Sequence, residues 1–134
     1  MRLVDSSAWI EYLRRTGSPA HLEVRRLLHE EPGEVAMTDP VIMELLSGPT
    51  DPGVVAQLER LVDGLPLLPV DADLDYRAAA AVYRAARKRG RTVHSLVDCL
   101  IAVVAARTGT VLVHRDRDFG LIAECLPDLR LHPL

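Results

Sequence analysis

Four acidic residues, spread over almost the whole chain of 134 residues, stand in settings that are unusual for surface acids. Asp5 and Asp98 each follow a pair of apolar residues, Glu44 lies between two such pairs, and Asp116 comes shortly after an apolar run. Carboxylate oxygens and water are the ligands that magnesium and manganese prefer, whereas zinc sites are typically built from histidine and cysteine. If folding brings the four acids together, they predict a site for a hard divalent cation. They therefore favour a metal-dependent enzyme, with a nuclease as the first choice.

The number of acids fits this chemistry. Three or four carboxylates carry more negative charge than one divalent ion neutralises, so they can hold one or two ions and repel one another without them. A cation held in this way polarises a phosphodiester, lowers the pKa of a bound water and stabilises the leaving oxygen. None of the five histidines has a spacing that resembles a nucleophile–base pair, so a Ser-His-Asp mechanism is not supported.

Each acid also has a purely structural explanation. Asp5 could cap the helix that follows it, and Asp98 occupies the position of the acid in a capping box. Glu44 could lie on a solvated strip of its helix, and Asp116 and Asp118 could be turn residues. However, the residues around Asp98 are apolar on both sides, and an ionised carboxylate there needs a cation or strong hydrogen-bond donors. No single acid decides between the two explanations.

Short apolar runs, which predict strands, alternate along the chain with longer segments that have apolar residues at helical spacing. We expect strands at 2–4, 34–37, 67–70, 110–113 and 130–132. We expect helices at about 6–14, 19–29, 40–48, 54–63, 72–88, 95–107 and 119–125, with Asp39 and Asp71 as caps.

This order predicts an α/β fold for residues 1–134: a three-layer α/β/α sandwich in one domain, with a central and mainly parallel sheet. Sites in such sheets lie beyond the carboxyl ends of the strands, where the strand order reverses. Asp5 and Asp116 each follow a predicted strand, so two of the four acids are expected at that edge.

The distribution of basic residues is more informative than the net charge of −3, which argues weakly against a nucleic-acid partner. Fifteen of the sixteen basic residues are arginine, whose planar group suits phosphate recognition. Five basic residues cluster in one helix and its end: Arg84, Arg87, Lys88, Arg89 and Arg91. The cluster is either a phosphate-binding surface or the solvated face of a helix whose arginines reflect a GC-rich genome, and the sequence leaves both open.

Nothing in the sequence predicts association with a membrane. The longest apolar run, from Cys99 to Ala106, is too short to span a bilayer, and residues after Met1 have no signal-peptide pattern. We therefore expect a cytoplasmic protein, in which Cys99 and Cys125 are buried thiols.

Taken together, the order and spacing of the four acids resemble the PIN-domain ribonucleases, and the resemblance covers essentially the whole chain as a single PIN domain. The Asp-Ser-Ser opening and the chain length are most similar to the VapC toxins of bacterial type II toxin–antitoxin pairs. The motifs that carry the resemblance are Leu3-Val4-Asp5-Ser6-Ser7 with Trp9-Ile10, the isolated Glu44, Asp98 with Ile101-Ala102, and Asp116-Arg117-Asp118-Phe119.

The resemblance implies a Mg²⁺- or Mn²⁺-dependent endoribonuclease that cleaves cellular RNA, such as tRNA or rRNA, with water as the nucleophile. By position, the catalytic residues of the family match Asp5, Glu44, Asp98 and Asp116. The implied metal ligands are Asp5, Asp98, Asp116 and Asp118, of which Asp118 matches an auxiliary acid present in many members of the family. The basic cluster would then contact RNA through Arg87, Arg89 and Arg91.

The resemblance also implies supporting residues and partners. Ser7 matches a small hydroxyl residue that hydrogen-bonds within the acidic site, whereas His114 stands where the family commonly has threonine. The implied partners are a second copy of the chain, as a homodimer, and a cognate VapB-type antitoxin that blocks the groove in a heterotetramer or larger complex. An apolar antitoxin segment could lie against the first helix, at Trp9, Tyr12 and Leu13, unless these residues belong to the core.

Two other classes of protein remain as alternatives: a phosphoryl-transfer or signalling α/β domain, and a PIN-like fold without catalysis. A receiver-type signalling domain needs a lysine after a late strand, but the only lysine, Lys88, lies inside an alanine-rich helix. A phosphatase with an Asp-x-Asp nucleophile is disfavoured because Asp5 is followed by two serines. A PIN-like fold without catalysis, which binds RNA or another protein, stays open.

Overall fold

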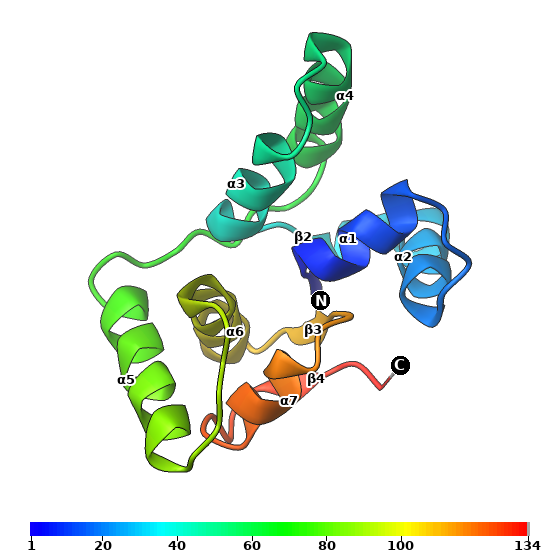
Figure 1. The fold of residues 1–134 in the computed structure, drawn as a ribbon. Helices are drawn as coiled ribbons and strands as arrows, with labels where there is room; N and C mark the ends of the chain where they lie inside the picture. The colour runs from blue at the N-terminus through cyan, green and yellow to red at the C-terminus, as the bar shows by residue number, and fades with distance from the viewer. Residues whose placement is uncertain (134) are drawn as a thin grey trace.

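A computed structural model describes residues 1–133 and contains four strands and seven α-helices in that range (Figure 1). The strands are β1 (Arg2–Val4), β2 (Val35–Ala36), β3 (Val111–Val113) and β4 (Arg130–Leu131). The helices are α1 (Ser6–Leu13), α2 (Pro19–Glu30), α3 (Asp39–Ser47), α4 (Pro52–Asp63), α5 (Asp75–Lys88), α6 (Leu96–Thr108) and α7 (Asp118–Ala123), with one 3₁₀ turn at Pro32–Glu34.

The four strands form one parallel sheet in the order β2-β1-β3-β4. Leu3 of β1 pairs with Ala36 on one side and with Leu112 on the other. The connection from β1 to β2 runs in one direction across the sheet, and the later connections run in the other. Because such connections are right-handed, they must cover opposite faces. Figure 1 shows this arrangement, with α1 and α2 on one side of the sheet and α5 and α6 on the other. The predicted three-layer sandwich is confirmed.

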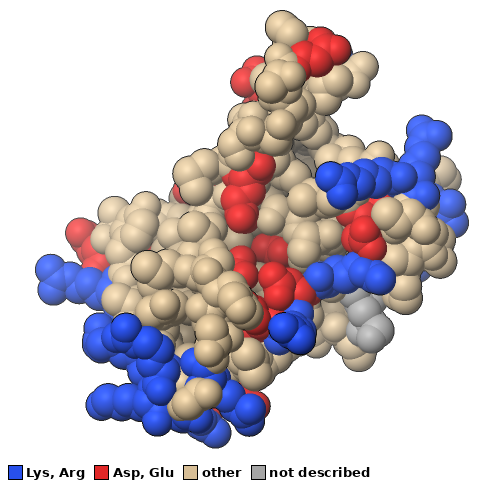
Figure 2. All heavy atoms as spheres, in the orientation of Figure 1, with Lys and Arg blue, Asp and Glu red and all other residues tan. Residues whose placement is uncertain are grey.

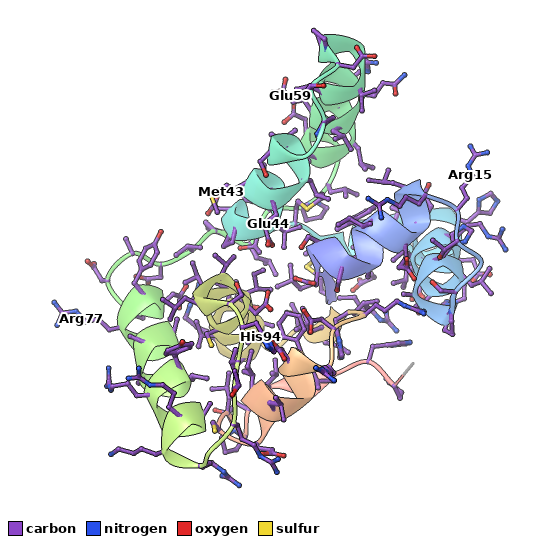
Figure 3. The ribbon with its side chains drawn as sticks, in the orientation of Figure 1. Arg15, Met43, Glu44, Glu59, Arg77 and His94 are labelled. Carbon is purple, nitrogen blue, oxygen red and sulfur yellow. The ribbon has the colours of Figure 1, made fainter. Side chains whose placement is uncertain are left out.

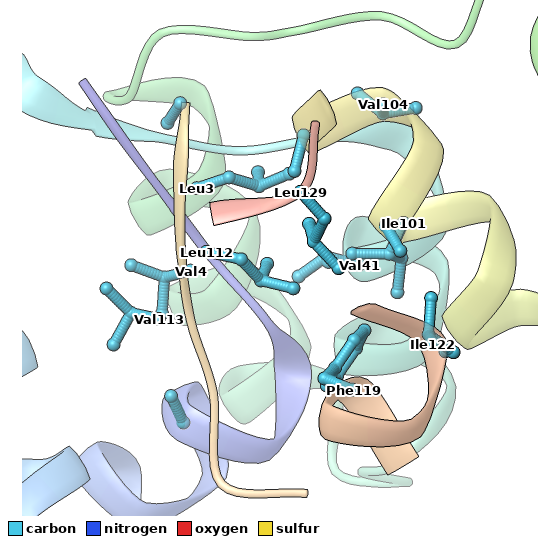
Figure 4. Packing of buried hydrophobic residues seen from close by; sticks show 14 of the residues in the cluster. Leu3, Val4, Val41, Ile101, Val104, Leu112, Val113, Phe119, Ile122 and Leu129 are labelled. Atoms are coloured by element: carbon cyan, nitrogen blue, oxygen red, sulfur yellow. The ribbon is translucent and has the colours of Figure 1, made fainter. Parts of the chain in front are cut away.

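The core is built from aliphatic residues of the central strands and the helices that cover them (Figure 4). Both faces of a parallel sheet are buried, so its strands are apolar throughout rather than alternating. Leu3, Val4 and Leu112 are fully buried, as are Ile101 of α6 and Phe119 of α7. Helix α6 is buried around most of its surface, which explains why it is the most hydrophobic helix of the chain.

The segment 67–70, which we expected to form a strand, does not form one. A single isolated parallel bridge to Met37 connects it with the end of β2. Within this bridge the N–H of Leu68 donates to the carbonyl of Met37 at 2.7 Å. The next N–H on the same side of the segment, that of Val70, donates instead to the carboxylate of Asp39 at 3.0 Å, so the pairing ends there. The prediction was wrong because it weighed the apolar character of the segment without this competing acid.

The two acids expected as helix caps have other roles. Asp39 is the first residue of α3 rather than its cap, and its carboxylate bonds outside the helix. Helix α5 begins at Asp75 rather than near residue 72, and Asp71 accepts hydrogen bonds from two N–H groups of the turn before it.

Asp75, the first residue of α5, forms an ion pair with Arg107 of α6. The Nε and Nη2 atoms of Arg107 lie 2.9 and 2.8 Å from the two carboxylate oxygens of Asp75, which is only 2% exposed. Burial raises the pKa of Asp75, but hydrogen bonds from Arg107 and Asp71 outweigh it and hold the pKa below its usual value. The pair therefore joins the two helices of this layer.

Replacing Arg107 by alanine is expected to lower the free energy of unfolding by about 2 kcal/mol, because it leaves a buried carboxylate without its partner. Because the pKa of Asp75 is lowered in the folded state, this contribution is present above the unfolded-state pKa and is lost as the pH falls through the folded-state pKa. Urea unfolding at neutral and strongly acidic pH measures it, with Arg77→Ala, an exposed position on α5, as the control. A difference that persists undiminished in acid would show that packing, and not the ion pair, is responsible.

Residues 1–133 contain no helix that is long and apolar enough to cross a membrane. Both cysteines are free thiols: Cys99 on α6 is buried, as expected, and Cys125 is half-buried.

Candidate metal centre

The site lies beyond the carboxyl ends of β1 and β3, the two adjacent central strands from which the connections leave in opposite directions. Asp5 directly follows β1, and its N–H continues the sheet by donating to the carbonyl of Val113 at 2.9 Å. Asp116 follows β3 by three residues. A cavity of about 450 Å³ opens at this edge. All five predicted acids line it: Asp5, Glu44, Asp98, Asp116 and Asp118.

Separate elements bring these acids together. Glu44 comes from α3, Asp98 from the first turn of α6, and Asp118 from the start of α7. Figure 2 shows acidic side chains gathered at the centre of this face, and Figure 3 shows Glu44 on α3 above the site. Carboxylate oxygens of Asp98, Asp116 and Asp118 all lie within 4.8 Å of one another, a spacing that one cation can span. Asp5 and Glu44 line the same cavity outside this group of three.

Asp5 uses its two carboxylate oxygens differently. Oδ2 caps α1: it accepts hydrogen bonds from the N–H of Ser7 at 2.9 Å and from its hydroxyl at 2.5 Å. Oδ1 is buried and accepts no hydrogen bond within residues 1–133. A buried acceptor without a partner is rare and costly, and a cation would satisfy it. The capping role and a metal-binding role are thus compatible in one residue.

Two serines hold the acids in place. The hydroxyl of Ser7, while donating to Asp5, accepts a hydrogen bond from the N–H of Arg115 at 2.9 Å, which links the ends of β1 and β3. The hydroxyl of Ser6 donates to Oε1 of Glu44 at 2.9 Å and so fixes the acid of α3. The role of Ser6 was missed because its partner is 38 residues away in the sequence.

His114 supplies the hydrogen bonding of the loop after β3. Its Nδ1 accepts a hydrogen bond from the N–H of Asp116 at 3.2 Å, and its ring packs against Phe119 with centroids 5.2 Å apart. Burial lowers the pKa of His114, which favours the neutral ring that this bond requires. His114 thus stands two residues before the fourth acid, at the position where the family commonly has threonine. Its ring nitrogen accepts a hydrogen bond from the N–H of that acid.

The acids raise one another's pKa. Burial raises the pKa of Asp98 to about 7, and the charges of Asp5, Asp116, Glu44 and Asp118 contribute in the same direction. Burial also raises the pKa of Asp5 to about 6, although the hydrogen bonds from Ser7 oppose this. Within residues 1–133, the carboxylate of Asp98 accepts no hydrogen bond that would offset its burial. Carboxylates that are costly to ionise because of burial and neighbouring charges are well placed to gain from a cation.

The three arginines predicted to contact RNA lie at the end of α5 and in the loop after it. Figure 2 shows basic side chains gathered at the lower left of this face and acidic ones near its centre. The guanidinium of Arg87 lies 5.3 Å from the centre of the Tyr83 ring. Arg89 donates to the carbonyl of Glu124 at 3.1 Å, and Arg91 pairs with its carboxylate at 3.2 Å. Two of the three therefore also tie α5 to the end of α7, and RNA contact stays a prediction.

Two residues of the cavity wall were missed by the sequence analysis: His94, in the loop before α6, and Arg117. His94 donates its backbone N–H to Oδ2 of Asp118 at 2.9 Å, and its ring Nδ1 lies 3.1 Å from the same oxygen. Histidines were considered only as partners of a nucleophile. No local sequence pattern marks a contact between His94 and Asp118, which are 24 positions apart in the sequence.

The predicted contact surface for an antitoxin needs a correction. Trp9 is fully buried in the core and cannot contact a partner, whereas Tyr12 is half-buried and Leu13 is exposed. A groove of about 480 Å³ runs between α1 and the pair of helices α3 and α4, which we call the α3–α4 arm. Leu13 and Val54 are among its apolar residues. The sequence could not decide whether Trp9 contacts a partner or the core. The helical pattern predicts an apolar stripe along α1, but it does not show which part of that stripe the next helix covers.

Comparisons with known proteins agree with this geometry. The model of the PIN domain family matches residues 2–124. A VapC ribonuclease of Mycobacterium bovis and Ribonuclease VapC11 of Mycobacterium tuberculosis are each 58% identical over 123 residues, which cover 92% of this chain and 92% of each relative.

Solved structures with the same fold include a DNA-bound VapBC from Salmonella typhimurium, with a TM-score of 0.74 and 22% identity over 98% of this chain and 96% of that one. They also include VapC20 of Mycobacterium tuberculosis, described as a sarcin-ricin loop cleaving toxin, with a TM-score of 0.63 and 22% identity over 97% and 99% of the two chains. From the family match and the 58% identity, the chain belongs to the PIN-domain family and, within it, to the VapC ribonucleases.

Proposed function

We propose that this protein is a metal-dependent endoribonuclease that hydrolyses phosphodiester bonds of cellular RNA in the cytoplasm, with tRNA or rRNA as the expected substrate. The observation that carries the proposal is the gathering of five carboxylates in one cavity at the switch point of the sheet. The relatives that are 58% identical are named as ribonucleases, which supports the same reaction.

The residues of the cavity fit Mg²⁺ or Mn²⁺. Asp5, with its unpartnered Oδ1, would hold the cation together with Asp98 and Asp116, and Asp118 lies beside them. When bound, the cation polarises the phosphodiester and lowers the pKa of water, the nucleophile in this reaction. Glu44, held by Ser6, completes the acidic wall of the cavity.

The test is cleavage of total RNA by the purified protein with Mg²⁺, with Mn²⁺ and with EDTA, followed by mapping of the product ends. We expect cleavage only with a divalent cation, and products that carry a 5′-phosphate and a 3′-hydroxyl. Binding of RNA without cleavage under any of these conditions would instead support a non-catalytic RNA-binding module.

We also propose that the protein forms a homodimer and is neutralised by a cognate VapB-type antitoxin. The support is the apolar groove between α1 and the α3–α4 arm, and the VapBC complexes among the solved structures of this fold. Leu13 and Val54, exposed along this groove, are the residues we expect the antitoxin to cover.

Joint replacement of Arg87, Arg89 and Arg91 by alanine is expected to weaken RNA binding for all sequences and to reduce the dependence of binding on salt concentration. Each arginine that contacts a phosphate contributes about one unit to the slope of log affinity against log salt, so the slope should fall by roughly one to three. Fluorescence anisotropy with an RNA oligonucleotide at several salt concentrations measures this slope.

The matched control for this variant removes three exposed arginines elsewhere, Arg25, Arg60 and Arg77. Because Arg89 and Arg91 also bond Glu124, thermal unfolding of both variants separates lost binding from lost structure. If the slope of the first variant equals that of the wild type, the cluster is a solvated helix face.

A further inference from the structure

His94 lies at the rim of the candidate metal centre with a side chain that is 67% exposed. Its backbone N–H and its ring Nδ1 both reach Oδ2 of Asp118, at 2.9 and 3.1 Å. Figure 3 shows His94 and Glu44 on opposite sides of the acidic site, so that His94 forms the wall facing α3. The imidazole is thus accessible to a ligand and is held by two contacts to one carboxylate.

The contact with Asp118 determines which ring nitrogen carries the proton. Oδ2 of Asp118 already accepts the backbone N–H of His94, and a carboxylate oxygen is an acceptor. Nδ1 must therefore donate its proton to Asp118, and in the neutral ring Nε2 is left as an acceptor. Nε2 lies across the ring from Nδ1, away from Asp118.

Nε2, as an acceptor, can form a hydrogen bond with a ligand only if a group of that ligand donates it. The phosphate groups of a nucleic acid accept hydrogen bonds and donate none. In RNA the ribose 2′-hydroxyl is the donor closest to each backbone phosphate, because it sits on the carbon next to the one that bears the 3′-oxygen. Asp118, which holds His94, is within 4.8 Å of the Asp98 and Asp116 oxygens, where the scissile phosphate would bind.

We propose that Nε2 of His94 accepts a hydrogen bond from the 2′-hydroxyl of a nucleotide next to the scissile phosphate. His94 is then a specificity-determining residue, which recognises RNA rather than DNA at the point of cleavage. The Nδ1–Asp118 bond restricts the ring, and the exposed side chain leaves Nε2 accessible to a substrate in the cavity. The inference rests on the proposed ribonuclease function and deepens it.

The experiment uses an RNA oligonucleotide that spans a cleavage site mapped on total RNA, and versions with a single 2′-deoxy or 2′-fluoro group at each nucleotide around that site. Fluorine accepts but does not donate a hydrogen bond, so both changes remove the donor. For the wild type, we expect one position at which either change lowers kcat/KM by about three- to tenfold, the effect of one neutral hydrogen bond. For His94→Ala, unmodified RNA should be cleaved more slowly by a similar factor, with no further loss at that position.

Two further variants make the result interpretable. His29→Ala, at an exposed histidine on α2, should behave like the wild type. His94→Phe retains a ring without nitrogens and should lose the 2′-hydroxyl effect as His94→Ala does, even if the smaller residue disturbs the loop. Asp118 keeps its bond from the backbone N–H of residue 94 in both variants.

The possible results separate the two claims. If no 2′ substitution affects the wild type, or if the penalty persists in His94→Ala and His94→Phe, the inference is overturned while the ribonuclease function stands. A persistent penalty with uniformly slower cleavage would show that His94 only positions Asp118. If the wild type cleaves no RNA with any divalent cation, the proposed function itself fails, and the unmodified substrate reveals this first.

Discussion

Replacing Asp98 by asparagine is expected to lower the rate of RNA cleavage roughly a thousandfold while leaving the fold intact. Asparagine has nearly the same size but carries no negative charge, so it replaces an anionic ligand of the group formed with Asp116 and Asp118 by a weaker, neutral one. The substitution breaks no hydrogen bond of the carboxylate within residues 1–133, and the bond from the N–H of residue 98 to Ser95 remains. Single-turnover cleavage of the mapped oligonucleotide measures the loss, and circular dichroism checks the fold.

The matched control is Asp73→Asn, at an exposed acid whose carboxylate forms no hydrogen bond or ion pair within residues 1–133. It should cleave like the wild type. Titration with Mn²⁺ followed by calorimetry should show weaker binding for Asp98→Asn only. Cleavage by Asp98→Asn at the wild-type rate would rule out the proposed role of this carboxylate.

Without metal, the protein is expected to become less stable as the pH rises from about 4 to about 7. The pKa values of Asp98, about 7, and Asp5, about 6, lie above the unfolded-state value of about 3.9. The folded state therefore binds more protons than the unfolded state in this window. The stability that these protons contribute is fully present below the unfolded-state pKa and is lost as the pH rises through the folded-state values. We expect a loss on the order of 6 kcal/mol from these two groups.

Urea unfolding in EDTA across this pH range measures the loss. Asp98→Asn should lose less stability over the range, because it lacks the larger of the two shifts. Saturating Mn²⁺ should restore about 3 kcal/mol or more at neutral pH, because it binds the ionised folded state. Equal pH profiles for the wild type and Asp98→Asn would contradict the raised pKa of Asp98.

Elements whose ends are set by local chemistry could be predicted from the sequence. The bounds of α6 are an example: the hydroxyl of Ser95 caps its start, and Gly109, with φ of +68°, takes the left-handed conformation at its end. In contrast, the failure of 67–70 to form a strand depends on Asp39, and the pairing of the buried Asp75 at the start of α5 depends on Arg107. These partners are about 30 residues away in the sequence, so no local pattern contains them.

The same distinction applies to the candidate site. Asp5 and Asp116 were expected at the sheet edge because each follows a strand, and the structure places both in the cavity. The contacts of Ser6 with Glu44 and of His94 with Asp118 were not foreseen. They join residues from different elements across the switch point, so their partners become visible only once the sheet order is known.

The most direct test of the central claim is a crystal structure with bound Mn²⁺, in which anomalous scattering locates the metal. We predict manganese in the cavity at the ends of β1 and β3, bound by water and by carboxylate oxygens drawn from Asp5, Asp98, Asp116 and Asp118. A cavity without manganese at a saturating concentration and neutral pH, or manganese bound only elsewhere on the protein, would contradict the account.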